Sequence, residues 1–108
     1  MKFGLSQVEY DFVTQTVVRP FKGIGLEVFC YGSRARGDFH KFSDLDLMIE
    51  GPSTQQAKIL RSQIEENLSK SNFPYKVDLV FLDEFATSYK KNYFADKKTW
   101  NLDTPTVD

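Results

Sequence analysis

The stretch that decides the fold is "CYGSRARGDFHKFSDLDLMIE", residues 30–50. An apolar run ends at Gly32-Ser33, a charged loop follows, and a second apolar run begins that carries Asp44 and Asp46. Short apolar runs bounded by turn residues are typical of buried strands. The stretch therefore predicts two strands joined by a polar loop, with two carboxylates that an ordinary core strand would not carry.

A first helix is predicted upstream of this stretch. Ser6 and Glu9 fit a capping box, in which each side chain accepts a hydrogen bond from the other residue's backbone N–H. Apolar residues follow at approximately helical spacing. Pro20 is expected to end this helix near Val18, because proline lacks the N–H that a helix interior needs.

Two more helices are predicted downstream. Ser53 and Gln56 form a second capping-box pattern, and apolar residues then recur at three- and four-residue intervals. This spacing predicts an amphipathic helix that ends near Asn72. Asp83 is expected to cap a last helix that carries several aromatic residues.

Strands are predicted over residues 26–31, 45–49 and 76–82, each of them a short apolar run. The order helix, strand, strand, helix, strand, helix predicts a small α/β or α+β domain with helices packed against a short sheet. We expect a single domain over residues 1–100 and a flexible, polar tail over residues 101–108.

Composition excludes several classes of protein. The 108 residues suit one domain, and the net charge of −1 makes direct nucleic-acid binding an unfavoured function. A single cysteine, Cys30, excludes a disulfide within the chain and is expected to be a small buried hydrophobe. No apolar run is long enough to span a membrane, and the N-terminus lacks the apolar core of a signal peptide. These features predict a soluble cytoplasmic protein.

Asp44 and Asp46 are predicted to share one face of a strand, while Leu45 and Leu47 face the core. Like charges held this close repel each other and raise each other's pKa, so protons or cations must neutralise them. Mg²⁺ suits a site with few carboxylates plus substrate phosphates. Taken alone, Asp44 fits an exposed turn residue equally well.

Asp78 is the third candidate ligand. It interrupts an otherwise apolar strand, where an unpaired aspartate is costly, so it lies at the exposed end of the strand or joins the other two carboxylates. Three carboxylates on two strands can hold two metal ions, the arrangement that serves in-line displacement at phosphorus. Asp44, Asp46 and Asp78 are therefore the predicted metal ligands and catalytic residues.

The loop that begins at Gly32-Ser33 is the predicted nucleotide-binding element. Glycine lets a phosphate approach the backbone closely, and the Ser33 hydroxyl adds a hydrogen bond. Arg34 and Arg36 supply positive charge for a triphosphate, although each is equally consistent with a solvated loop charge. No Lys-Ser/Thr follows the loop, which excludes a P-loop.

These motifs resemble a known signature. Gly32-Ser33, ten intervening residues and Asp44-Leu45-Asp46, with a late Asp78 in "KVDLVF", resemble the DNA polymerase β-like nucleotidyltransferase superfamily. The sequences "GSRARG" and "SDLDL" are similar to the corresponding motifs of its minimal nucleotidyltransferase (MNT) branch. The resemblance covers most of the chain, roughly residues 26–85.

The resemblance implies a small mixed sheet backed by helices and the transfer of a nucleoside monophosphate from ATP or another NTP, with two Mg²⁺ ions in the active complex. By this resemblance, Asp44 and Asp46 would each bind both metal ions. Asp78 would bind the catalytic metal ion and help to activate the acceptor hydroxyl. The resemblance assigns the triphosphate to Gly32 and Ser33.

The resemblance also implies a partner. Members of this branch are often encoded beside a helical HEPN-family protein as toxin–antitoxin pairs, and some add AMP to a tyrosine of the toxin. We therefore expect a hetero-oligomer in which this chain is the antitoxin. Phe85, Tyr89, Tyr93 and Phe94 are candidates for the partner-facing surface, with core packing as the alternative.

Two other functions stay open at this point. The chain also resembles the catalytic subunits of two-protein nucleotidyltransferases that modify small molecules. An antitoxin that acts only by binding is the third alternative, and the complete set of three aspartates favours an enzyme over it.

Overall fold

A mixed four-stranded sheet forms the centre of the computed structural model, which describes residues 2–102. The strand order is β3-β2-β1-β4; β1 pairs antiparallel with both β2 and β4, and β2 pairs parallel with β3. The strands are β1 (Glu27–Tyr31), β2 (Leu45–Glu50), β3 (Val77–Phe81) and β4 (Lys98–Thr99). The predicted fold class, a small mixed sheet with helices, is confirmed.

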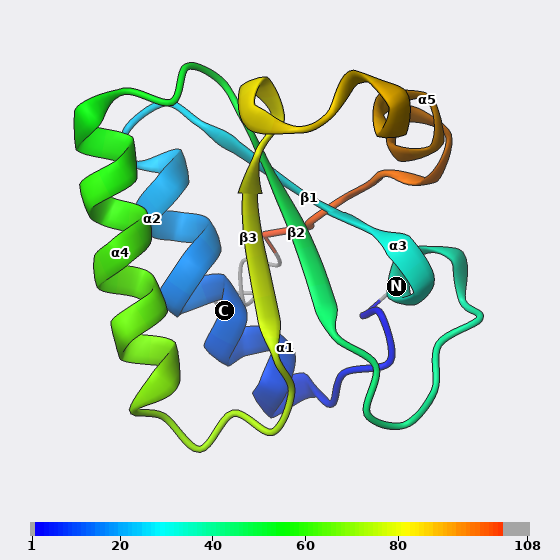
Figure 1. Ribbon diagram of the computed structural model, residues 1–108. Helices are drawn as coiled ribbons and strands as arrows, with labels where there is room; N and C mark the ends of the chain where they lie inside the picture. The colour runs from blue at the N-terminus through cyan, green and yellow to red at the C-terminus, as the bar shows by residue number, and fades with distance from the viewer. Residues whose placement is uncertain (1, 103–108) are drawn as a thin grey trace.

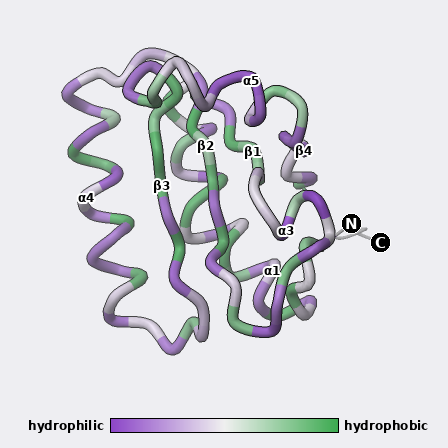
Figure 2. The backbone as a smooth tube through the Cα atoms, turned by 45° about the vertical axis from the view of Figure 1, so that its right-hand side comes forward, coloured by the Kyte–Doolittle hydropathy of each residue, from purple (hydrophilic) through white to green (hydrophobic). Residues whose placement is uncertain are grey.

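Helices cover one face of this sheet more fully than the other (Figure 1). The helical elements are α1 (Gln7–Val13), a π-helical segment (Thr14–Val18), α2 (Arg19–Lys22), α3 (Gly32–Arg36), α4 (Gln55–Ser69) and α5 (Thr87–Asp96). The N-terminal helices and α4 lie side by side against one face, whereas α5 lies beyond the other. Hydrophilic and hydrophobic stretches alternate along α4, as expected of an amphipathic helix (Figure 2).

The first helix departs from its prediction at Pro20. The capping box of Ser6 and Glu9 is present, but the helical path continues past Val18 into α2. The π-helical turn, in which the Arg19 N–H bonds to the Thr14 carbonyl, widens the helix just before the proline. Pro20 then occupies the first turn of α2, where its missing N–H costs little.

The start of α4 is one residue later than the capping-box pattern predicted. Thr54 is the cap, and its side chain accepts a hydrogen bond from the Ala57 N–H. The Ser53 hydroxyl donates instead to Asp83, 30 residues along the chain. Asp83 therefore does not cap the last helix as predicted, because it lies in a 3₁₀ turn and its carboxylate is engaged by Ser53.

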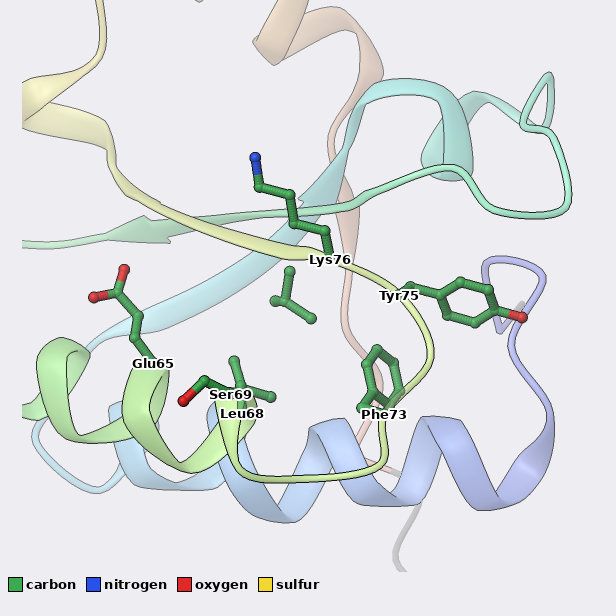
Figure 3. A pocket seen from close by; sticks show the side chains of 7 residues that line it. Glu65, Leu68, Ser69, Phe73, Tyr75 and Lys76 are labelled. Atoms are coloured by element: carbon green, nitrogen blue, oxygen red, sulfur yellow. The ribbon is translucent and has the colours of Figure 1, made fainter.

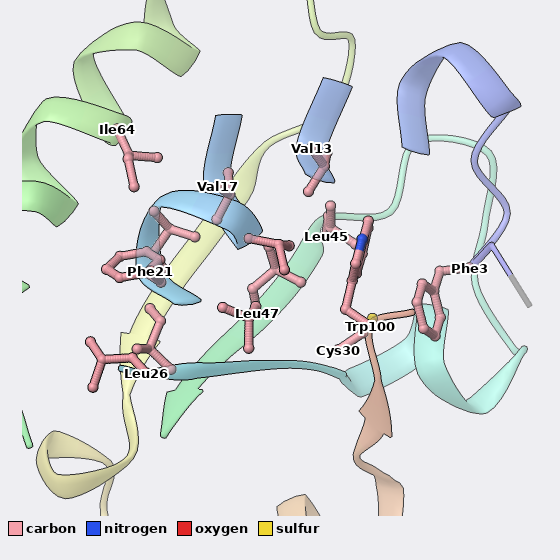
Figure 4. Packing of buried hydrophobic residues seen from close by; sticks show 14 of the residues in the cluster. Phe3, Val13, Val17, Phe21, Leu26, Cys30, Leu45, Leu47, Ile64 and Trp100 are labelled. Carbon is pink, nitrogen blue, oxygen red and sulfur yellow. The ribbon is translucent and has the colours of Figure 1, made fainter. Parts of the chain in front are cut away.

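The core lies between the sheet and the layer formed by the N-terminal helices and α4 (Figure 4). Leu45 and Leu47 of β2 are fully buried in it, as predicted. Cys30 is also fully buried, and burial raises the pKa of its thiol to about 12, which confirms the prediction of a hydrophobic role. This packing leaves the alternate side chains of β2 on the opposite face.

The described chain ends close to the first helix. The Tyr10 hydroxyl donates to the Asn101 carbonyl, and Leu102 packs against the core. The remainder of the predicted tail, residues 103–108, lies outside the described residues. Within residues 2–102 no helix is long and apolar enough to cross a membrane.

Candidate active site

Asp46 and Asp78 are direct neighbours across two strands. The parallel register of β2 and β3 places Asp46 opposite Asp78. Both side chains are half-buried, on the sheet face opposite the buried Leu45 and Leu47. Asp44 is exposed and lies just ahead of β2. The sheet therefore brings together two of the three predicted carboxylates, with the third at the entrance of the same strand.

Repulsion within this carboxylate pair is relieved by a proton. Burial, the charge of Asp78, a hydrogen bond with Asp78 and the charge of Asp44 together raise the pKa of Asp46 from 3.8 to about 6. At neutral pH the pair loses that proton and concentrates negative charge on oxygen ligands, which is the chemistry that a divalent cation neutralises.

The three carboxylates do not yet form a closed metal site. In the described part of the chain, no three His, Cys, Asp or Glu side chains are arranged to hold an ion. The donor chemistry nevertheless fits Mg²⁺, which keeps several waters and takes substrate phosphates as ligands, so it does not need an all-protein cage.

Gly32 brings the predicted nucleotide loop against this pair. Its φ of +76° is in the left-handed region, and a Cβ placed on it would lie 2.5 Å from Oδ2 of Asp46. Any other residue at this position would therefore displace the carboxyl group. Ser33 follows directly in α3, so the Gly-Ser turn lies beside Asp46 of the pair.

Arg34 is not a solvated loop charge. Its side chain is only 1% exposed, and its guanidinium donates to the carbonyl oxygens of Ser43 and Phe3. This burial does not fit the predicted contact with a triphosphate, because the donors that would bind phosphate are directed at the protein's own backbone. The sequence pattern could not distinguish the two roles.

Arg36 remains at the surface near the pair. It forms ion pairs with Asp96 of α5 at 2.9 Å and with Asp38 at 3.2 Å. The hydrogen bond to Asp96 and, after it, the hydrogen bond to Asp38 raise the pKa of Arg36. The positive charge of Arg36 in turn lowers the pKa of Asp46. Its exposed guanidinium is compatible with the predicted contact to phosphate.

Tyr31 lies beside the carboxylates, a position that the sequence pattern did not single out. It pairs with Asp46 in the register of β1 and β2, so its side chain is on the same face as the carboxylates. Burial, followed by the charges of Asp46 and Asp78, raises its pKa to about 12. The hydroxyl therefore stays protonated at neutral pH. Its position directly before Gly32 was the available signal.

The aromatic residues of α5 divide between the two predicted roles. Tyr93 is buried and packs edge-on against Tyr31 at 5.4 Å, and its hydroxyl donates to Glu50. Tyr89 and Phe94 are largely exposed. Of the four predicted aromatic residues, one is therefore buried (Tyr93), one is half-buried (Phe85) and two are exposed (Tyr89 and Phe94).

The pocket shown in Figure 3 is separate from the carboxylate pair. It is lined by the end of α4 and by the segment that leads into β3, including Leu68, Phe73 and Tyr75. The Lys76 side chain points away from Leu68 in this view, and its ammonium lies 3.7 Å from Asp78. Lys76 is a second residue near the site that the sequence pattern did not single out.

A small mixed sheet with a Gly-Ser turn against paired aspartates defines the class of protein. Residues 11–101 match the family described as "Nucleotidyltransferase domain", and the chain belongs to this family of enzymes. The predicted family and the predicted enzyme class are thereby confirmed.

Two known proteins illustrate the relationship. The chain is 38% identical over 85 residues to the "Probable protein adenylyltransferase MntA" of Haemophilus influenzae, with 74% of each chain covered. It also shares its fold with a solved structure described as a toxin–antitoxin with AMP-PNP, at a TM-score of 0.61 and 22% identity, covering 81% of this chain and 71% of the other.

Proposed function

We propose that this chain is a Mg²⁺-dependent protein adenylyltransferase that moves AMP from ATP onto a tyrosine hydroxyl of a helical HEPN-family partner, and that it acts as the antitoxin of the pair. The observation that carries the proposal is the contact geometry of Gly32, Asp46 and Asp78, which puts a turn suited to phosphate beside two carboxylates.

The relatives support the choice of AMP and of a protein acceptor. MntA, which is 38% identical, is named as a protein adenylyltransferase. A structure with the same fold contains a toxin–antitoxin with AMP-PNP. The chemistry of the site is consistent with both, because an ATP triphosphate and paired carboxylates together require a cation between them.

The proposed reaction is an in-line displacement at the α-phosphorus of ATP. A bond forms between the acceptor oxygen and Pα, the bond from Pα to the bridging oxygen breaks, and pyrophosphate leaves with the electron pair. Asp78 takes the proton of the acceptor hydroxyl. Gly32 and Ser33 would hold the triphosphate, and Asp44, Asp46 and Asp78 would hold the cations. When bound, these cations neutralise the charge that develops on the phosphate oxygens.

Labelling with ATP tests the proposal. The protein is incubated with Mg²⁺, ATP labelled at the α-phosphate and the product of the neighbouring gene, and label on the partner is followed by gel and mass spectrometry. We expect label on a partner tyrosine with wild type and none with Asp46→Asn. Asp83→Asn is the matched control, because this carboxylate binds Ser53 outside the site, and it should label like wild type.

Two results would overturn parts of the proposal. Equal partner labelling by wild type and Asp46→Asn would remove the catalytic role of the carboxylates. ATP consumption that depends on a small hydroxylated acceptor, with no label on protein, would identify the small-molecule enzyme instead.

A further inference from the structure

Arg34 joins three segments that are distant in the sequence. Its Nε donates to the Ser43 carbonyl at 3.0 Å, and its Nη1 donates to the Phe3 carbonyl at 2.9 Å. Figure 1 shows the corresponding elements together: α3, the loop that follows it and the N-terminal segment. A buried guanidinium that satisfies backbone carbonyls fixes their relative positions, because its donors have a rigid planar geometry.

Two aromatic rings hold the guanidinium in place. Its central carbon lies 5.0 Å from the ring centre of Phe39 and 4.3 Å from that of Tyr75. Within residues 2–102 its Nη2 has no hydrogen-bond partner, so the faces of these rings are the neighbours that accept its charge. Tyr75 precedes β3, the strand that carries Asp78, and thereby connects Arg34 to the second strand of the site.

These contacts restrain the backbone on both sides of Asp44. On one side, the Ser43 carbonyl is held by Arg34. On the other, the Leu45 N–H donates to the Lys76 carbonyl at 2.8 Å. Asp44 itself is exposed and precedes the strand, so sheet hydrogen bonds alone do not fix it. The bond from Arg34 to the Ser43 carbonyl connects the residue before Asp44 to α3, the helix that begins at Gly32.

We propose that Arg34 is a positioning residue for metal binding: it holds Asp44 at the correct place relative to the Gly-Ser turn and the Asp46–Asp78 pair. This inference rests on the proposed function, because it assumes that these carboxylates bind a divalent cation. It replaces the predicted role of Arg34 as a direct ligand of the triphosphate.

Direct metal binding tests this role without an activity assay. Mn²⁺ alone is titrated into wild type and Arg34→Lys, with free Mn²⁺ followed by electron paramagnetic resonance, at a temperature where circular dichroism shows both proteins folded. Lysine keeps the charge but lacks the planar fork that donates to two carbonyls at once. We expect Mn²⁺ affinity to fall about tenfold or more, the effect typical of residues that orient metal ligands.

Variants at Tyr75 and Arg61 separate positioning from general stability. Arg61 also stacks on an aromatic ring, that of Phe81 at 4.5 Å, but it belongs to α4 and not to the loops around the carboxylates, so Arg61→Lys should leave Mn²⁺ affinity unchanged even where it lowers Tm. Tyr75→Phe keeps the ring beneath Arg34 and should bind like wild type, whereas Tyr75→Leu should weaken Mn²⁺ binding.

The outcomes are distinguishable. If Arg34→Lys lowers Tm while folded protein binds Mn²⁺ as wild type does, Arg34 is merely structural and the inference is overturned. If Arg34→Lys does not fold, Tyr75→Leu decides by the same criterion. If wild type itself binds no Mn²⁺, the metal assignment of the proposed function fails, and the positioning role fails with it.

Discussion

Gly32 and Asp46 are in contact in a way that only glycine permits. A Cβ on Gly32 would lie 2.5 Å from the Asp46 carboxyl oxygen, and the backbone there has a φ of +76°. Because Gly32 has no side chain, the turn proposed to hold phosphate can lie directly against the carboxylate proposed to hold metal.

We expect Gly32→Ala to lose both activity and stability. The left-handed backbone alone costs about 1–2 kcal/mol for a non-glycine residue, and the methyl group would also push the Asp46 carboxyl out of place. Gly37→Ala is the matched control, because Gly37 has a φ of +95° but a Cβ there would meet only open space. Urea unfolding should show a loss for both variants, whereas AMP transfer should be lost for Gly32→Ala alone; equal activities would show that the contact with Asp46 is unimportant.

The stability of the metal-free protein should depend on Asp46 and on pH. The pKa of Asp46 is raised from 3.8 to about 6 in the folded state, so between these values the folded protein binds more protons than the unfolded chain. Its contribution to stability is therefore fully present below about pH 4 and is lost as pH rises through about 6.

Asp46→Asn should remove this dependence and stabilise the protein at pH 7, by on the order of 1 kcal/mol because the half-buried carboxylate is partly screened by solvent. Urea unfolding at pH 4.5 and 7 measures the effect. Asp83→Asn should act in the opposite direction, since hydrogen bonds from Ser53 lower the pKa of Asp83 and stabilise its charged form. A destabilised Asp46→Asn at pH 7 would contradict the assignment.

Mg²⁺ should stabilise wild type more at pH 8 than at pH 5. The pKa of Asp46 is about 6, so at pH 5 a proton is bound to the Asp46–Asp78 pair and competes with the metal. A ligand at ten times its Kd adds about 1.4 kcal/mol to the free energy of unfolding, a rise of several degrees in Tm for a domain of this size. Thermal melts with Mg²⁺ and with EDTA measure this, and the increment should vanish in Asp46→Asn.

Thr54 and Ser53 offer a test of which residue caps α4. Thr54→Ala removes the acceptor of the Ala57 N–H and should cost about 1 kcal/mol of stability. Ser53→Ala removes an exposed hydrogen bond to Asp83 and should cost less. Urea unfolding of both variants gives the comparison, and a larger loss in Ser53→Ala would assign the cap to Ser53.

The local sequence was sufficient for features that depend on near neighbours. The capping box of Ser6 and Glu9, the alternation that buries Leu45 and directs Asp46 to the other face, and the turn at Gly32 each follow from residues a few positions apart. The boundaries of β1, β2 and β3 were predicted within one residue for the same reason: apolar runs end where turn residues begin. The two-residue strand β4 was not predicted, because it is polar and is defined only by its pairing with β1.

Long-range contacts decided the rest. Ser53 and Thr54 are equivalent as local caps, and the engagement of Ser53 by Asp83 leaves the cap to Thr54. Local rules predict that the helix ends before Pro20, but a π-helical turn precedes the proline and the helical backbone continues into α2. The local sequence around Arg34 suggests an exposed charge in a loop. Backbone carbonyls and aromatic rings from distant segments nevertheless bury its side chain.

By itself, the sequence determined which residues could form the site: the Gly-Ser turn, Asp44 just ahead of β2, Asp46 in β2 and Asp78 in β3. Only the tertiary structure decided their arrangement. The parallel register that places Asp46 opposite Asp78 arises when α4 returns the chain to the sheet, and the approach of Gly32 to Asp46 arises when β1 pairs with β2. Register and close approach are properties of paired strands, so no single segment carries them.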